Sequence, residues 1–232
     1  MGKIEDLLTG TKILERINSP LNGEIVVIRG LIFGTYIQVG GLTQSGGILK
    51  SVWRKPLKKL ANSKKQVEEV LILGLGGGTV AGLVREYWPE ARITGVDLDP
   101  IMVELGRRYL GLDKYNVNVV IGDAFDFLKN MKHEIRNSKR KILNTKFKIL
   151  NSKYDLVLVD LYIGSEYPKK FEEEEFIKRT KLVLKQNGVV IFNRLYYGEK
   201  RSGAVRFGKK LEKIFEKVFV VYPEANIMYL CF

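Results

Sequence analysis

The sequence contains few of the side chains that most often carry metal or thiol chemistry. Its 232 residues include one cysteine and one histidine. A single thiol cannot form an internal disulfide, and Cys231 lies in an apolar run at the end of the chain, which favours a buried, inert thiol over a nucleophile. His133 stands in a basic segment without the spacing of a metal site. We therefore predict that no metal takes part in the function.

Long apolar runs are also absent. No stretch approaches the roughly 18 apolar residues of a membrane helix, and the first six residues lack the apolar core of a signal peptide. These absences predict a cytoplasmic protein without a membrane partner. With 45% hydrophobic and 28% charged residues, the composition is that of a globular chain, and its length suits one α/β domain with a smaller appendage.

Acidic residues are fewer than basic ones, at 26 against 39, and the formal net charge is +13. The excess is concentrated in residues 129–153, which hold nine lysines or arginines and one acid. This basic insertion contains a tandem near-repeat, residues 141–147 followed by 148–154. A solvated surface segment is the favoured interpretation, and docking of RNA or another polyanion is the alternative.

The most informative stretch covers residues 69–79. Four apolar residues lead into a glycine cluster and then into a helical pattern, which predicts a strand, a tight turn and a helix. The cluster consists of Gly74, Gly76, Gly77 and Gly78. Glycine lets the backbone turn sharply and lets its N–H groups approach a ligand. Asp97 ends the next apolar run, 23 residues after Gly74, near the spacing of about 20 expected for a carboxylate that holds a ribose. Together these features predict a nucleoside site, and a purely steric use of the glycines is the alternative.

Strands and helices alternate with short connections from residue 66 onward, which is typical of a parallel sheet with right-handed crossovers. We predict strands at 69–73, 92–97, 117–121, 155–160 and 188–194, and helices at 79–87, 100–110, 123–132, 171–185 and 202–216. The apolar runs 218–223 and 226–232 are joined by a turn too short for a crossover and must pair antiparallel. The predicted fold is α/β, a doubly wound Rossmann-like sheet with a C-terminal antiparallel hairpin, which resembles the class I methyltransferase type.

Residues 1–62 follow a different pattern and form a predicted N-terminal unit. Residues 1–17 are polar and helix-like, whereas 24–29 and 35–39 are β-rich runs separated by glycines, which predicts a small antiparallel β module. A connector and a helix near 48–60 lead into the main domain, residues 63–232.

Polar residues at the carboxyl ends of the predicted strands are the candidate ligands, because open α/β sheets bind ligands at that edge. Asp123 could accept a hydrogen bond from an adenine amine, with helix capping as the alternative. Asp160 would face the reacting end of a nucleoside held by Asp97, as a general base or as the group that orients an amine, with a cap or turn role as the alternative. Asn193 ends the next strand along the chain.

These motifs occur together in the spermidine synthase (polyamine aminopropyltransferase) family, which the chain resembles. The segments that match are 23–27, 39–44, 73–78, 96–100, 122–124 and 159–160. The resemblance runs from about residue 20 to the C-terminus, interrupted by the basic insertion, and includes the β module that ordinary methyltransferases lack. It implies S-adenosylmethionine or its decarboxylated form as the donor, and it implies a homodimer or tetramer.

The resemblance also implies roles for individual residues. The donor would be held by Gln44, Gly74, Gly76, Gly78, Asp97, Asp123 and Ala124, with the adenine near Asp123. Asp160 would accept the proton of the attacking amine. Tyr222, in a late Tyr-Pro pair, and Tyr162, beside Asp160, are the predicted substrate contacts.

Three departures separate the chain from the family pattern. The family's glycine loop carries an Asp where this chain has Gly77, and that acid would hold the donor's ammonium group. The second carboxylate of the family's Asp-x-x-Asp motif is replaced by Ile163, and the acidic, tyrosine-containing stretch after Gln44 is replaced by residues 45–54. The diamine site is thus largely dismantled, because a dication needs carboxylates or aromatic faces at both ends.

The main prediction is therefore an enzyme that binds S-adenosylmethionine and transfers its methyl group to a small-molecule acceptor, an amine or another small nucleophile, with Asp160 as the base. Aminopropyl transfer from decarboxylated S-adenosylmethionine is the second hypothesis. An RNA-binding or RNA-modifying protein that uses the basic insertion is the third, and a non-catalytic nucleoside binder is the fourth. An NAD dehydrogenase is disfavoured because the third glycine of the dinucleotide pattern would fall at Thr79.

Overall fold

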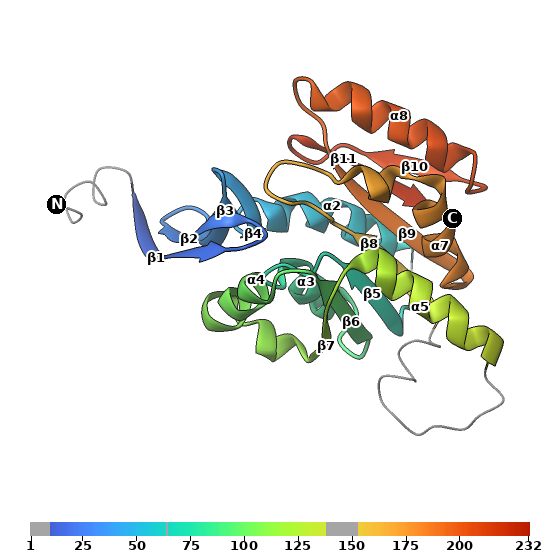
Figure 1. The fold of residues 1–232 in the computed structure, drawn as a ribbon, viewed down its shortest axis with the longest axis horizontal. Helices are drawn as coiled ribbons and strands as arrows, with labels where there is room; N and C mark the ends of the chain where they lie inside the picture. The colour runs from blue at the N-terminus through green and yellow to red at the C-terminus, as the bar shows by residue number, and fades with distance from the viewer. Residues whose placement is uncertain (1–9, 64, 138–152) are drawn as a thin grey trace.

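The computed structural model describes residues 10–63, 65–137 and 153–232, which form two sheets of different kinds (Figure 1). The first is a four-stranded antiparallel sheet with the strand order β1-β2-β3-β4. Its strands are β1 (Thr11–Ser19), β2 (Gly23–Gly30), β3 (Gly34–Val39) and β4 (Leu42–Gly46). The predicted N-terminal β module is therefore present, and β4 is a strand that was not expected.

The prediction of a helix over residues 1–17 is wrong in the part that the structure describes, because residues 11–19 form strand β1. This strand pairs with β2, and its Leu14 and Ile17 pack against the core of the module. A register shift between Ile13 and Glu15 breaks the alternation of apolar and polar residues, which hides the strand pattern in the sequence. Residues 1–9 lie outside the described residues.

The second sheet has seven strands in the order β10-β11-β9-β8-β5-β6-β7. These are β5 (Glu69–Leu73), β6 (Arg92–Asp97), β7 (Val117–Ile121), β8 (Tyr154–Val159), β9 (Leu184–Leu195), β10 (Val218–Val221) and β11 (Asn226–Cys231). The pairs among β5 to β9 are parallel, whereas β11 pairs antiparallel with both β9 and β10. The predicted fold class is confirmed, including the C-terminal antiparallel hairpin.

Helices cover both faces of this sheet because successive strand residues point to opposite sides. The helices are α2 (Leu49–Asn62), α3 (Thr79–Tyr87), α4 (Pro100–Leu105), α5 (Ala124–Asn137), α7 (Glu174–Leu182) and α8 (Lys200–Glu212). In β5, Val70 and Ile72 share a core with α2 and α3, whereas Leu71 and Leu73 share a core with α5, α7 and α8. None of the helices that the structure describes is long and apolar enough to cross a membrane.

The chain is helical over 100–110, as predicted, but the winding changes within this range. Helix α4 ends at Leu105, and a π-helical turn, η1 (Gly106–Leu110), follows it before the short 3-10 helix η2 (Leu112–Tyr115). At Gly106 the backbone lies directly on the glycine loop, so a Cβ atom there would be 2.5 Å from the Cα of Gly77. This turn therefore helps to set the shape of the loop.

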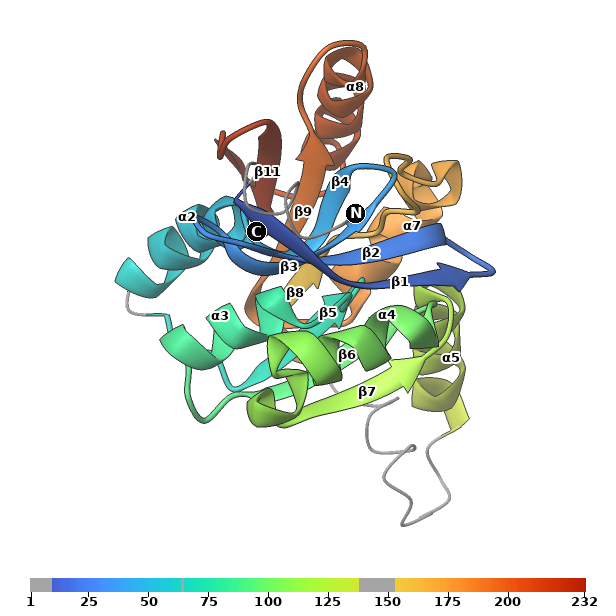
Figure 2. The same cartoon turned by 90° about the vertical axis from the view of Figure 1, so that its left-hand side faces the viewer.

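The two sheets are joined by buried polar contacts as well as by apolar packing. In Figure 2 the N-terminal strands lie in front of the main sheet. Ser19 Oγ donates to Asp99 Oδ2 at 2.5 Å, and Asn22 Nδ2 donates to the same oxygen at 2.7 Å. Asp99 also caps α4 by accepting from the N–H of Ile101 at 2.9 Å. The module is thus held at a fixed position beside the polar ends of the main strands.

Candidate active site

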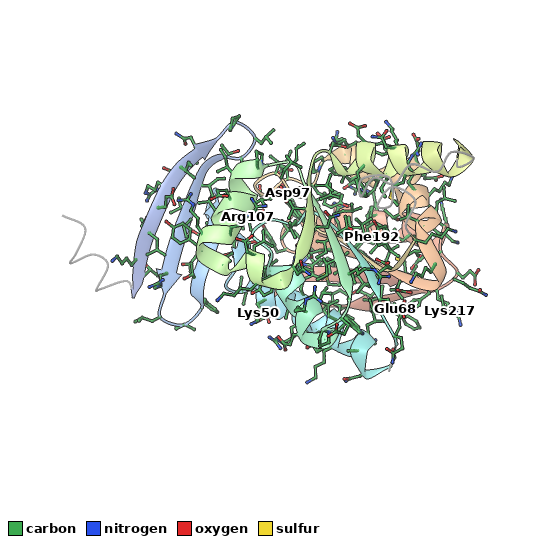
Figure 3. All side chains as sticks on the ribbon, turned by 90° about the horizontal axis from the view of Figure 1, so that it is seen from below. Lys50, Glu68, Asp97, Arg107, Phe192 and Lys217 are labelled. Carbon is green, nitrogen blue, oxygen red and sulfur yellow. The ribbon has the colours of Figure 1, made fainter. Side chains whose placement is uncertain are left out.

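A cleft of about 540 Å³ lies where the strand order of the main sheet reverses, at the ends of β5, β6 and β8. Eight of the ten predicted site residues line it: Gln44, Gly74, Gly76, Asp97, Asp123, Ala124, Asp160 and Tyr162. In Figure 3, Asp97 lies at the end of the sheet that faces the N-terminal strands, whereas Glu68, just before β5, lies at the opposite end. The N-terminal module therefore closes one side of the cleft.

The glycine loop after β5 adopts a backbone that side chains disfavour. Gly74, Gly76 and Gly78 have φ angles of +87°, +55° and +88°. A Cβ atom on Gly74 would lie 2.0 Å from the carbonyl oxygen of Asp160. Glycine at this position therefore lets the ends of β5 and β8 meet, while Gly78 packs on Leu112 and is not part of the cleft lining.

Asp97 is bound to the glycine loop. Its Oδ2 accepts from the N–H of Gly76 at 2.6 Å, and its Oδ1 accepts from the N–H of Asp99 at 2.9 Å. Burial raises the pKa of Asp97, and these backbone hydrogen bonds act in the opposite direction. Each carboxylate oxygen can accept a further hydrogen bond, so the group can hold the loop and still accept from two vicinal hydroxyls.

Two side-chain hydrogen bonds connect the N-terminal module to the same loop. The N–H of Gly77 donates to Ser45 Oγ at 2.7 Å, and the N–H of Gly46 donates to Thr79 Oγ1 at 2.6 Å. Ser45 is buried, with 1% of its surface exposed. Its role has no signal in the sequence, because it depends on how the module docks.

The space beside Gly77 is filled. A Cβ atom there would lie 2.7 Å from Leu110 Cδ1, 3.0 Å from Ser45 Cβ and 3.1 Å from Ile37 Cδ1. A side chain at position 77 would therefore begin in an apolar contact between the module and η1, and Gly77 is not part of the cleft lining.

Asp160 follows β8 and receives hydrogen bonds from two neutral donors. Trp53 Nε1 donates to Oδ2 at 2.7 Å, and Asn193 Nδ2 donates to Oδ1 at 2.8 Å. Asn193 in turn accepts from Asn226 Nδ2 at 2.8 Å. Burial raises the pKa of Asp160, and the hydrogen bonds from Asn193 and Trp53 oppose that rise. Among the residues that the structure describes, no lysine or arginine forms an ion pair with this carboxylate.

Asp123 caps a helix, as its alternative interpretation predicted. Its Oδ1 accepts from the N–H groups of Phe125 at 2.8 Å and Asp126 at 3.1 Å, and its Oδ2 pairs with Lys170 Nζ at 2.5 Å. Burial acts to raise the pKa of Asp123, but the Lys170 ammonium and the helix N–H groups together hold it below its ordinary value. Contact with an adenine amine stays a prediction for Asp123, as it does for the adjacent Ala124.

Gln44 faces the segment that follows Asp160, and Tyr162 belongs to that segment. Gln44 Nε2 donates to the carbonyl oxygen of Gly164 at 2.9 Å, which links the module to this segment across the cleft. The hydroxyl of Tyr162 accepts from the N–H of Leu195 at 2.7 Å, and burial raises its pKa. The phenol therefore stays neutral, and its ring forms part of the cleft wall.

The structure does not bring Tyr222 to the cleft. Its side chain is 59% exposed and packs against Tyr196, with ring centroids 5.4 Å apart. Glu224, in the turn that follows, and Asn226, the first residue of β11, do line the cleft. Sequence reasoning missed both of these residues. It also missed Trp53, because the sequence pattern of α2 indicates only that Trp53 belongs to the apolar face of a helix.

Other groups singled out in the sequence lie away from the cleft. Cys231 is buried in β11, and burial raises the pKa of its thiol well above the ordinary value. Most of the basic insertion, including residues 138–152, lies outside the described residues. Within the described part of the chain, no three or more His, Cys, Asp or Glu side chains come together as they would in a metal site.

Residues 59–228 match the family model described as the spermine/spermidine synthase domain. A polyamine aminopropyltransferase of Vibrio vulnificus (strain CMCP6) is 29% identical over 148 residues, which cover 61% of this chain and 44% of that protein. An eEF1A lysine and N-terminal methyltransferase homolog of Drosophila melanogaster is 28% identical over 207 residues, which cover 87% of this chain and 28% of that protein. The chain thus spans less than half the length of these curated relatives.

Solved structures show the same fold. Spermidine synthase from Thermotoga maritima superposes with a TM-score of 0.68 at 17% sequence identity, covering 94% of this chain and 72% of that chain. Human methyltransferase-like protein 13 in complex with SAH superposes with a TM-score of 0.58 at 21% identity, covering 79% of this chain and 80% of that chain.

The predicted enzyme class, a transferase of the S-adenosylmethionine type, agrees with the names of these relatives. Because the family match covers most of the sequence and includes the glycine loop, Asp97 and Asp160, the chain belongs to the spermine/spermidine synthase domain family.

Proposed function

We propose that this chain binds S-adenosylmethionine in the cleft and transfers its methyl group to an amine or another small nucleophile. The observation that carries the proposal is the donor end of the cleft. There, Thr79 and Val80 at the start of α3 line the cleft, and α3 has neither a side-chain cap nor an acidic residue in its first turn. Such a helix start favours a carboxylate ligand, and S-adenosylmethionine carries one whereas its decarboxylated form does not.

Three of the four carboxylates that line the cleft have other assignments, and the fourth, Glu224, lies in the turn after β10 and pairs with Lys55 at 3.6 Å. Asp123 is paired with Lys170 at 2.5 Å, Asp97 is bound to the glycine loop, and Asp160 lies at the far side of the nucleoside site. The family resemblance places the acid for the donor's ammonium group at position 77. This chain has a glycine there, and neighbouring side chains fill the space beside it. A donor whose tail carries only a positive charge therefore gains little at this end.

In the proposed complex, Asp97 accepts from the ribose hydroxyls, and Asp123 and Ala124 lie near the adenine. Gln44 lines the same cleft from the module side. The sulfonium methyl would then point toward Asp160. The attacking nitrogen forms a bond to the methyl carbon while the carbon–sulfur bond breaks, S-adenosylhomocysteine leaves, and the proton lost by the nitrogen passes to Asp160.

The surroundings of Asp160 suit a proton acceptor. Both of its hydrogen-bond donors are neutral, so no cation competes for the carboxylate, and burial favours its protonated form. For methyl transfer from a sulfonium, the protein needs to do little more than align the two reactants, exclude water and remove this proton.

Donor preference tests the proposal. Titration calorimetry at fixed ionic strength would compare S-adenosylmethionine with its decarboxylated form. A charge-assisted hydrogen bond contributes about 1.5–3 kcal/mol, so we expect the carboxylated donor to bind about tenfold or more tightly, at about 1.4 kcal/mol per factor of ten. Tighter binding of the decarboxylated donor would refute methyl transfer.

A matched pair of variants locates the binding site. Asp97→Asn should abolish most donor binding, whereas Asp113→Asn should leave it unchanged, because the Asp113 side chain is 75% exposed and lies outside the cleft lining. The acceptor is then sought with a panel of propylamine, putrescine and a lysine-containing peptide, with S-adenosylhomocysteine release as the readout. The peptide is included because the methyltransferase relatives are named for lysine and N-terminal methylation.

Aminopropyl transfer is the second candidate, and one observation favours it. Glu224 lines the cleft together with Asp160, and its charge is only loosely paired, with Lys55 Nζ at 3.6 Å. Two carboxylates at the acceptor end would suit a dicationic amine, even though position 163 is isoleucine. This candidate predicts preference for the decarboxylated donor and turnover with putrescine, so the same titration separates it from methyl transfer.

A further inference from the structure

A buried guanidinium lies directly behind the wall of the cleft. Arg194 is in β9, and only 7% of its surface is exposed. Its neighbours Asn193 and Leu195 line the cleft. Because successive strand residues point to opposite faces, the Arg194 side chain points to the other side of the sheet, into the core beneath α8, where it lies 4.8 Å from the ring of Phe207.

The Arg194 side chain touches three points of one segment. This wall segment, residues 161–172, runs from Asp160 to the end of the 3-10 helix η3 (Lys169–Glu172). Arg194 Nη2 lies 2.6 Å from Glu172 Oε1, and the guanidinium carbon lies 3.9 Å from the ring centroid of Tyr167. It also lies close enough to the hydroxyl of Tyr162 to lower the pKa of that group, against the larger effect of burial.

The wall segment has little regular structure of its own. Besides η3, it contains an isolated bridge between Ile163 and Glu166. Two of its other connections reach the cleft itself: Gly164 accepts from Gln44 at 2.9 Å, and Lys170 pairs with Asp123 at 2.5 Å. Two more come from α8: Lys200 pairs with Glu166 at 2.5 Å, and Lys210 Nζ donates to the carbonyl oxygen of Glu172 at 2.9 Å. The position of the segment therefore depends on side chains that hold it from outside, and Arg194 contacts both its beginning and its end.

The hydrogen bonding around Arg194 and Tyr167 is incomplete. Arg194 Nη1 and the hydroxyl of Tyr167 are both buried and find no hydrogen-bond partner among the described residues. A buried ion pair is often no more stabilising than apolar residues of the same volume, and unpaired buried polar atoms weaken it further. A gain in net stability therefore does not explain why a buried charge lies here. Holding β9 and the wall segment in a fixed geometry does explain it.

We infer that Arg194 is a positioning residue that holds the wall segment against β9 and thereby fixes the acceptor side of the cleft. Arginine suits this task because its planar group lies over the ring of Tyr167 while Nη2 at its edge binds Glu172. The inference rests on the proposed function only in taking this side of the cleft as the acceptor site.

Arg194→Lys is the main test, because lysine keeps the charge but loses the stacking plane and the fork. Hydrogen exchange followed by mass spectrometry should show the amides of residues 161–172 exchanging at least tenfold faster, through local opening of the segment. With the amine of the panel that is turned over, KM should rise by about tenfold while kcat changes less, and donor affinity should change less than KM.

Arg179→Lys is the matched control. Arg179 also pairs with a glutamate, Glu175 at 2.6 Å, and lies over an aromatic ring, Phe125 at 5.8 Å, but it belongs to α7 and does not line the cleft. We expect no change in exchange within 161–172. Tyr167→Leu serves as the second variant if Arg194→Lys fails to fold, because it removes the stacking face while keeping the ion pair.

Two results would overturn the inference: unchanged exchange in the wall segment of these variants, or faster exchange spread evenly over the whole chain, which would indicate general destabilisation. The exchange experiment needs no acceptor. If the proposed methyl transfer fails on the amine panel, the exchange of residues 161–172 still decides the role of Arg194.

Discussion

Replacing Trp53 by phenylalanine removes one hydrogen-bond donor from Asp160 and keeps an aromatic ring in a fully buried position. Trp53 is 0% exposed, and its indole N–H is 2.7 Å from Asp160 Oδ2. That hydrogen bond stabilises the ionised carboxylate, and burial already raises the pKa of Asp160. In Trp53→Phe the pKa of Asp160 should therefore rise further, because Asn193 remains the only donor to the carboxylate among the described residues.

The size of the effect follows from the kind of bond that is lost. Hydrogen bonds to charged groups contribute about 1.5–3 kcal/mol, and 1.4 kcal/mol changes an equilibrium about tenfold. A base acts in its deprotonated form, so activity falls as the pH decreases through its pKa. On the acidic side of the pH profile, the Trp53→Phe rate should be about tenfold or more below that of the parent, while the rates at high pH should converge.

The assay is the pH dependence of S-adenosylhomocysteine release, with carbon NMR of labelled aspartate as a readout that needs no acceptor. Trp88→Phe is the control, because the Trp88 indole also donates a partly buried hydrogen bond, at 3.1 Å, but to the backbone oxygen of Lys65 outside the cleft. A rate lowered equally at every pH, with the Asp160 carboxyl resonance titrating as in the parent, would refute the assignment of Asp160 as a base tuned by Trp53.

Two further predictions concern the walls of the nucleoside site. Gly106→Ala should destabilise the fold by about 3 kcal/mol or more, because its Cβ would lie 2.5 Å from the backbone of Gly77 and neither backbone segment can move freely. Thermal unfolding measures this loss. Lys170→Met should lower the free energy of unfolding by at most about 1 kcal/mol at pH 7, since the Lys170 side chain is 45% exposed. The loss should be smaller at pH 3 than at pH 7 in chemical denaturation, because Asp123, whose pKa is lowered in the folded state, contributes stability above its unfolded-state pKa that is lost as the pH falls through its folded-state pKa.

Neighbouring residues supply the controls for both variants. Gly122→Ala should be nearly neutral, because a Cβ there meets nothing within 4 Å. If Gly122→Ala and Gly106→Ala are equally stable, the contact between η1 and the glycine loop is not rigid. Lys169→Met removes an exposed lysine for which no ion pair is found in the described part of the chain, so it should leave the pH dependence unchanged. An equal effect of both lysine variants at pH 7 and pH 3 would contradict the pairing with Asp123.

The sequence predicts the parts of the site that depend on local geometry. The bounds of β5, α3, β6 and β7 agree with the residues expected for them, because contiguous apolar runs and glycines with positive φ mark those elements directly. Asp97 is similarly fixed by its place at the end of β6. The fold class follows from the alternation of these elements, since parallel strands need crossovers and a short final turn excludes one.

The sequence does not predict contacts that arise only when elements dock. Trp53 and Asp160 are 107 positions apart, and their hydrogen bond depends on how α2 packs over the end of β8. Tyr222 was expected at the cleft because the resemblance matches it to the family's late Tyr-Pro pair, but the turn after β10 places Glu224 there instead. Asp123 illustrates a third limit, because one carboxylate can cap a helix and bind a ligand, and residue type alone does not separate the two roles.

The glycine at position 77 connects this packing to the choice of donor. Its missing side chain is matched by Gly106, whose backbone occupies the neighbouring space, and by Leu110 and Ile37, which close the gap from η1 and the module. An aspartate introduced at 77 would place its carboxylate among these apolar atoms, and desolvation without a partner is costly. The contact between the loop, η1 and the N-terminal module therefore fits a glycine at position 77 and not the acid that the family resemblance implies there. An aspartate at position 77 would require these three elements to move together, so we expect the single substitution Gly77→Asp to disrupt this contact rather than to place a carboxylate in the cleft.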